Sequence, residues 1–130
     1  DVRNAIKSLT GGAGADVIFD PVGGDLADTL ARSTSWNGRW LVIGFAAGAI
    51  PKVPLNLPLV KGYSIMGVFW GSFCDRESTQ AQTNHRQLFE MAASGSITPH
   101  LHAVMPLNEA PHALSQIEQR KVQGKIVLKP

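Results

Sequence analysis

Side chains with the chemistry for catalysis or metal binding are few in this sequence. His100 and His102 are two residues apart, so a strand would place both imidazoles on one face, where they could bind a metal ion. No carboxylate or thiol accompanies them at ligand spacing, and we therefore predict hydrogen-bonding or surface histidines. Cys74 is the single cysteine, and a lone, partly buried thiol is far commoner than a nucleophile. From these residues we predict neither a metal ligand nor a catalytic side chain.

A glycine cluster, Gly11-Gly12-Ala13-Gly14, invites comparison with a dinucleotide-binding turn. In the fingerprint G-x-G-x-x-G the third glycine would fall on Val17. The fingerprint also follows a strand and opens a helix, whereas this cluster precedes a strand. Neither a G-x-x-x-x-G-K-[ST] phosphate loop nor a G-x-S-x-G nucleophile elbow occurs. We therefore predict no phosphate-binding loop of these types within the chain.

Length and composition are those of one ordinary folded domain. The chain has 130 residues, of which 44% are hydrophobic and 17% charged, and disordered chains show the opposite balance. Twelve basic and ten acidic residues give a net charge of +2, which predicts neither nucleic acid nor a membrane as a partner. One cysteine excludes an internal disulfide framework and favours a reducing, cytoplasmic location. The sequence starts without methionine or a signal peptide, so we expect Asp1 to be an internal residue of a longer protein.

Short apolar runs separated by glycine and proline predict alternating strands and helices. Residues 2–9 have the apolar spacing of a helix end. The unbroken apolar run within residues 16–20 predicts a strand that is buried on both faces, as in a parallel sheet. Residues 25–34 have a helical apolar stripe with Asp25 as its cap, and residues 40–43 predict a second buried strand. Together they predict a right-handed strand–helix–strand unit with parallel strands.

The rest of the chain continues this alternation after a long loop. Residues 45–61 contain three prolines and predict a stiff loop, and residues 63–70 predict a third strand. In the later helices we expect Leu88, Leu114 and Ile117 to be buried. The remaining elements are predicted as a helix at 78–94, a strand at 103–105, a helix at 108–121 and a strand at 125–128.

The carboxyl ends of the three predicted parallel strands share one composition. Ligands bind outside these ends in open α/β sheets. Each end combines small residues, which let a ligand approach the backbone, with an apolar or aromatic side chain. Such a surface suits a flat, uncharged ring that bears an amide, and the alternative is that the segments are only tight turns. The segments are Pro21-Val22-Gly23, Gly44-Phe45-Ala46-Ala47-Gly48 and Val68-Phe69-Trp70-Gly71.

Taken in order, four segments give the chain a family resemblance. They are Leu9 to Gly24, Asn37 to Gly48, Asn56 to Gly71 and Pro106 to Leu128. Over essentially all 130 residues the chain resembles the C-terminal part of the medium-chain dehydrogenase/reductase superfamily, and most closely its zinc-free NADPH:quinone oxidoreductase branch. The resemblance implies an α/β fold. Residues 1–97 would be the C-terminal half of a Rossmann parallel sheet, its strands four to six, and residues 98–130 the C-terminal segment of a GroES-like catalytic domain.

The resemblance also implies a reaction. An enzyme of this branch transfers a hydride from NADPH to a small-molecule quinone or an activated alkene such as an enone, and the cofactor carries the chemistry. The alternatives are an enoyl-thioester reductase or a zinc-dependent alcohol dehydrogenase of the same superfamily, or a non-catalytic α/β association module. The glycine-rich cofactor turn of the family would lie upstream of Asp1, so we expect the isolated fragment to be inactive.

Cofactor contacts and a partner are further implications of the resemblance. Arg120 matches a basic position that reaches the cofactor phosphates in some members, although a solvated cation at a helix end is an equal alternative. The family pairs its sixth strands edge to edge, which here implies a homodimer through Tyr63 to Phe69. The implied cofactor contacts are Pro21, Val22, Ile43, Gly44, Phe45, Ala46, Val68, Phe69, Trp70 and Arg120.

Overall fold

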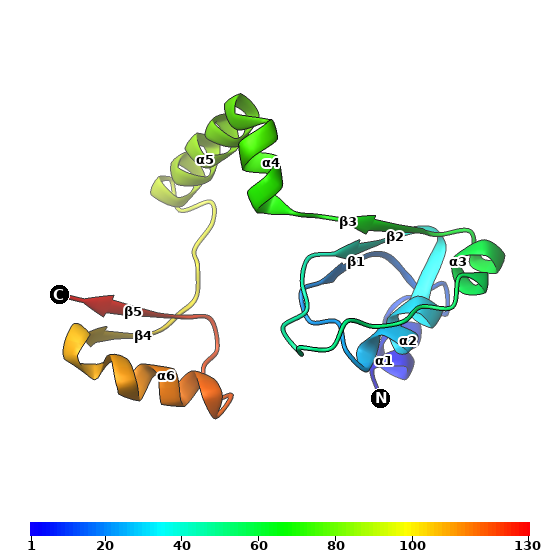
Figure 1. Ribbon diagram of the computed structural model, residues 1–130, viewed down its shortest axis with the longest axis horizontal. Coiled ribbons are helices and arrows are strands. Elements are labelled where there is room, and N and C mark those ends of the chain that lie inside the picture. Colours follow the sequence, from blue (N-terminus) through cyan, green and yellow to red (C-terminus); the bar gives the residue numbers. More distant parts are fainter. The chain divides into compact units, whose positions relative to one another are not determined.

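The computed structural model describes residues 1–130, which fold into two compact units, Asp1–Arg76 and Glu77–Pro130 (Figure 1). The domain division implied by the resemblance, between residues 97 and 98, concerns the domains of a full-length enzyme and stays a prediction. The first unit alternates helices and strands. Its elements are α1 (Val2–Leu9), β1 (Ala15–Asp20), α2 (Leu26–Ser33), β2 (Thr34–Val42), α3 (Asn56–Lys61), β3 (Ser64–Gly67) and α4 (Trp70–Arg76).

A three-stranded parallel sheet forms the centre of the first unit. The strand order is β1-β2-β3, and both neighbouring pairs run parallel. Ile18 on β1 lies opposite Trp40 on β2, which in turn lies opposite Ile65 on β3. The predicted α/β fold with parallel strands is confirmed, and α2 is the crossover between β1 and β2. Because all three strands run in the same direction, their carboxyl ends lie at one edge of the sheet.

The core of this unit lies on one face of the sheet. Side chains alternate along a strand, so Val17, Phe19 and Met66 point to the opposite face. All three are exposed there, Phe19 to 67%. The prediction that residues 16–20 are buried on both faces is therefore wrong for this chain, because α2 and α3 cover only one of them. The buried core residues are Ile18, Ala27, Ala31, Trp40, Leu57 and Tyr63.

Two strands have other boundaries than the sequence predicts. β2 begins well before residue 40 and contains an irregularity at Asn37-Gly38, where the pairing register with β1 shifts and Asn37 has φ 59°. The third strand is shorter than predicted. Its last residue pair is Val42 with Gly67, where β2 ends and offers no further partner. Trp70, which the apolar run assigned to the strand, instead begins α4.

Helix ends in the first unit follow ordinary capping chemistry. An Asp1 side-chain oxygen accepts hydrogen bonds from the amides of Arg3 and Asn4, at 3.0 and 3.4 Å, and so caps α1. Gly62 ends α3 in the left-handed conformation, with φ 61°. Asp25 precedes α2 as predicted, but its side chain makes no capping hydrogen bond.

The second unit contains two helices, a 3-10 turn and a two-stranded sheet. Its strands run parallel, in agreement with the mixed α/β prediction. Leu88, Leu114 and Ile117 were expected inside, yet they are 48%, 66% and 54% exposed. The reason is that the unit has a small core, in which Ala81 and Ala113 are the buried apolar side chains. The elements are α5 (Ser78–Ala93), β4 (Leu101–Pro106), η1 (Leu107–Glu109), α6 (Ala110–Glu118) and β5 (Lys125–Lys129).

None of the helices combines the length and the apolar character that a membrane crossing demands.

Candidate functional site

The turns that follow β1 and β2 are joined by backbone hydrogen bonds. The amide of Ala46 donates to the Pro21 carbonyl at 3.1 Å, and the amide of Ala47 donates to the Val22 carbonyl at 3.0 Å. A third bond, from the Gly24 amide to the Ala49 carbonyl at 3.1 Å, joins the two turns further along the chain. The two turns therefore form one continuous backbone surface at the carboxyl edge of the sheet.

A buried carboxylate holds these turns in place. Asp20, the last residue of β1, is only 4% exposed. One carboxylate oxygen, Oδ1, accepts from the amides of Val22 and Gly23, at 3.0 and 2.9 Å. The other, Oδ2, accepts from Nε1 of Trp40 at 3.2 Å. Both oxygens of this buried anion are thus satisfied, as the desolvation of a charge demands.

Asp20 also reaches the second turn through its main chain. Its carbonyl oxygen accepts from the amides of Ile43 and Gly44, at 2.9 and 3.4 Å. The sequence reasoning did not select this residue. A signal was present, since an aspartate at the end of an apolar strand, followed by Pro-Val-Gly-Gly, is well placed to bond the amides of the next two or three residues.

Most backbone donors of the second turn are already used within the chain. The amides of Ile43, Gly44, Ala46 and Ala47 each donate to a carbonyl of residues 20–22. The amide of Phe45 makes no such bond. The Phe45 amide is therefore the one backbone donor of residues 43–48 that is left for a ligand.

Two shallow hollows open beside these turns. The first, of about 310 Å³, is lined by residues 42–45 of the β2 end and residues 67–69 of the β3 end. The second, also of about 310 Å³, is lined by residues 67–70 together with Phe73. No titratable side chain lines either hollow. Such lining suits an apolar or uncharged ring held mainly by shape and backbone contacts.

Gly44 keeps the first hollow open. A Cβ atom built on this residue would lie 3.5 Å from the Pro21 carbonyl oxygen, which is an ordinary van der Waals contact. A small side chain at this position is therefore compatible with the fold, whereas a larger one would extend into the hollow.

Aromatic side chains of α4 border the second hollow. The rings of Trp70 and Phe73 stack with their centroids 5.3 Å apart and an interplanar angle of 27°. Trp70 is 45% exposed, and Phe69 beside it is more exposed still. Phe73 was not predicted as a site residue, because residues 63–70 were predicted as a strand and no helix was expected directly after them.

Nine of the ten predicted cofactor contacts thus lie at one edge of one sheet. They belong to the ends of β1, β2 and β3 and to the start of α4. The tenth, Arg120, lies in the second unit after α6, where it has φ 57° and its amide donates to the Ile117 carbonyl at 2.9 Å. That these ten residues contact a cofactor stays a prediction.

The candidate metal ligands are dispersed. His102 accepts a hydrogen bond from the Gln123 amide through Nδ1, at 3.5 Å, and Cys74 is half-buried on α4. No group of three or more His, Cys, Asp or Glu side chains converges in a way that could hold a metal ion.

Comparisons with known proteins give one consistent result. The model of a family described as zinc-binding dehydrogenase matches residues 1–128. The mouse (Mus musculus) quinone oxidoreductase-like protein 2 is 38% identical over 98% of this chain, which covers 36% of that protein. Quinone oxidoreductase 1 of Escherichia coli is 29% identical over the whole chain, which covers 40% of it.

A solved structure agrees with these sequence relatives. A mycobacterial protein in complex with NADPH is 26% identical and superposes with a TM-score of 0.83, over 98% of this chain and 39% of that one. The chain therefore spans well under half the length of each protein that it matches here.

Proposed function

The chain belongs to the zinc-binding dehydrogenase family, within the medium-chain dehydrogenase/reductase superfamily, and we propose that it forms part of the NADPH site of an enzyme that reduces a quinone or an activated alkene. The observation that carries this proposal is the pair of apolar hollows at the β2 and β3 ends, which no titratable side chain lines, beside the turn that follows β1. When bound, the nicotinamide supplies the hydride. The mycobacterial relative in complex with NADPH supports the choice of cofactor.

In this proposal the chain's own residues orient the ring and exclude water. The turns joined by Asp20 offer a surface of fixed backbone, and Gly44 lets a flat ring approach it. Phe69 and Trp70 provide apolar cover at the second hollow. No side chain of the two hollows can carry a proton, so any proton that the reduced substrate needs comes from elsewhere in the enzyme or from water.

The family description refers to zinc, and the residues of this chain do not fit a zinc site. His100 precedes β4, His102 lies on β4 and Cys74 lies on α4. Tetrahedral zinc needs three or four converging nitrogen, sulfur or oxygen ligands, and no such group is formed. No step assigned to this chain involves the metal.

The domain and partner assignments belong to the same proposal. Residues 1–97 contribute the second half of the cofactor-binding sheet, residues 98–130 return to the catalytic domain, and Arg120 binds a cofactor phosphate. Two copies of the enzyme pair through β3, an edge strand whose four residues are all exposed. Because the chain spans only 36% of the mouse relative, the segment alone is expected to be inactive.

Tryptophan fluorescence of the full-length protein tests the cofactor site. We expect NADPH to quench tryptophan emission by energy transfer to the nicotinamide, and Trp70→Phe to reduce that transfer measurably. Trp36→Phe is the matched control, because Trp36 lines neither hollow. If NADPH changes no emission at millimolar concentration, the enzyme proposal is wrong. If transfer occurs but the two variants behave alike, the placement of the ring beside Trp70 is wrong.

A further inference from the structure

A third cavity lies at the opposite edge of the sheet, where the strands begin. It has a volume of about 150 Å³. Residues 12–14 reach it just before β1, Arg32 and Ser33 just before β2, and Lys61 shortly before β3. Because the strands are parallel, this edge is remote from the turns that follow β1 and β2, and the proposed function makes no use of it.

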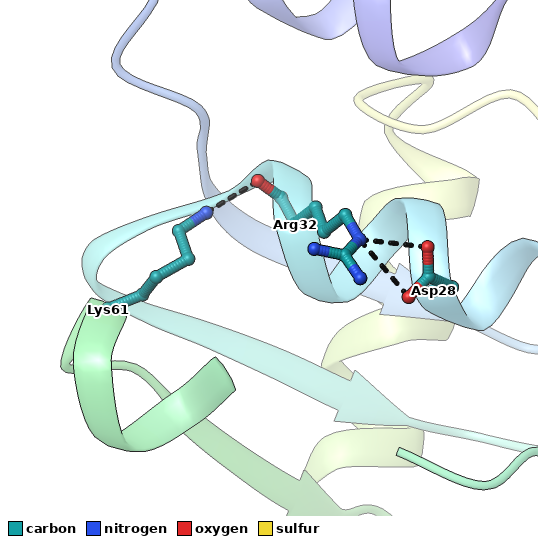
Figure 2. A network of polar contacts seen from close by, with 3 residues as sticks. All are labelled: Asp28, Arg32 and Lys61. Carbon is teal, nitrogen blue, oxygen red and sulfur yellow. Dashed lines mark hydrogen bonds and ion pairs between the residues drawn. The ribbon is translucent and has the colours of Figure 1, made fainter. Parts of the chain in front are cut away.

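The lining of this basic cavity is strongly cationic. Four basic side chains from three helices line it: Arg3 and Lys7 of α1, Arg32 of α2 and Lys61 of α3. Asp28 is the single acidic partner, and its carboxylate binds Arg32 with Nε 2.9 Å from Oδ2 (Figure 2). No acidic residue lines the cavity itself, although the chain as a whole has a net charge of only +2.

Lys61 is fixed in this cationic environment. Its ammonium group donates to the carbonyl oxygen of Arg32, at the end of α2 (Figure 2). Burial lowers the pKa of Lys61, and the nearby charges of Arg3 and Arg32 lower it further. An anion in the cavity would offset this repulsion.

We infer that the basic cavity binds a phosphate group, either as inorganic phosphate or as the phosphate of a small monoester. A volume of 150 Å³ corresponds to about five water molecules of liquid, which is enough room for one such group. Guanidinium and ammonium groups bind phosphate oxygens through charge-assisted hydrogen bonds, and a dianion balances the excess charge better than one carboxylate does.

The binding would come from side chains and not from a glycine-rich phosphate loop. The amides of Gly12 and Ala13 donate to the carbonyls of Lys7 and Thr10, and the amide of Gly14 donates to the hydroxyl of Thr10. All three amides at this edge are therefore already used. This agrees with the sequence analysis, which assigned no phosphate loop to the cluster, and it makes the charged side chains the residues to test.

Calorimetric titration of the full-length protein with inorganic phosphate tests the inference. Ionic strength is held constant with chloride, and NADPH is present at saturation so that its own phosphate contacts are occupied. We expect one phosphate bound per chain. The double variant Arg3→Gln/Lys7→Gln should bind it roughly ten- to a hundredfold more weakly, because two charge-assisted contacts are lost. Both residues are exposed on α1, so the variant is expected to fold.

The matched control is Arg86→Gln/Lys121→Gln, which removes the same two charges from the second unit. Unchanged phosphate affinity in this control supports the inference. Absence of binding above chloride, or an equal loss in both double variants, overturns it. Glycerol 3-phosphate in place of phosphate assigns the source: tighter binding indicates a monoester, and weaker binding indicates the free ion. A protein that binds phosphate here but shows no NADPH fluorescence effect would refute the proposed function alone.

Discussion

At the scale of single residues, the buried charge of Asp20 connects the two turns of the candidate site. We expect Asp20→Asn to lower the free energy of unfolding by about 1–3 kcal/mol, because a neutral amide cannot accept from two backbone amides and from the Trp40 indole at once. The amide NH₂ would face at least one of these donors. We also expect weaker NADPH binding, since both turns lose their common anchor. Urea denaturation and cofactor titration of the full-length protein measure the two effects.

Asp25→Asn is the control for this change, because Asp25 is exposed and its side chain caps nothing. A specific role of Asp20 requires that only the Asp20 variant loses stability and cofactor affinity. If Asp20→Asn loses stability and keeps its NADPH affinity, the residue supports the core without shaping the site. If Asp20→Asn and Asp25→Asn change stability and NADPH affinity equally, the hydrogen bonds of Asp20 contribute little to either property.

At the scale of elements, the passage from α3 to β3 depends on one glycine. Gly62 has φ 61°, and a Cβ atom there would lie 2.8 Å from Cζ3 of Trp36. We expect Gly62→Ala to lower the free energy of unfolding by about 2 kcal/mol, from backbone strain together with displacement of the indole ring. Gly48→Ala is the control, because Gly48 has φ 85° and no heavy atom near its Cβ position. Only the backbone cost of about 1 kcal/mol should appear there.

Denaturation in a Trp36→Ala background separates the two contributions. Once the ring is absent, Gly62→Ala and Gly48→Ala should cost the same. A difference that persists without Trp36 would mean that the contact with the indole ring is not the cause.

The elements also show what the sequence could and could not predict. The strands around Ile18 and Trp40 were predictable, because an unbroken apolar run bounded by glycine and proline can adopt few structures other than a buried strand. The end of β3 was not predictable, because it depends on where β2 ceases to offer a partner. Whether Leu114 is buried depends on which other segments cover α6, and the sequence of α6 alone does not specify those segments. The local bonds of Asp20 to the amides of Val22 and Gly23 could have been predicted from the sequence, whereas its bond to Trp40, twenty residues away, depends on the strand pairing.

At the scale of the whole molecule, β3 is an edge strand with no proline and no charged residue to protect it. The Val68 amide donates to the Val42 carbonyl of β2 at 2.9 Å. Since successive amides along a strand point in opposite directions, the amide of Met66 also faces β2, and that of Ile65 faces away from it. The Ile65 amide is therefore available to a second copy of the strand in the proposed dimer.

Replacing Ile65 with proline removes that donor and leaves the pairing with β2 intact, as edge strands tolerate. We expect the full-length protein to be a dimer, Ile65→Pro to be a monomer at the same concentration, and Ile65→Ala to remain a dimer. The alanine variant loses the same packing of the side chain but keeps the amide, so it separates the hydrogen bond from the packing. Analytical ultracentrifugation measures the mass, and circular dichroism checks that both variants fold. A folded Ile65→Pro variant that still dimerises would exclude β3 as the dimer interface.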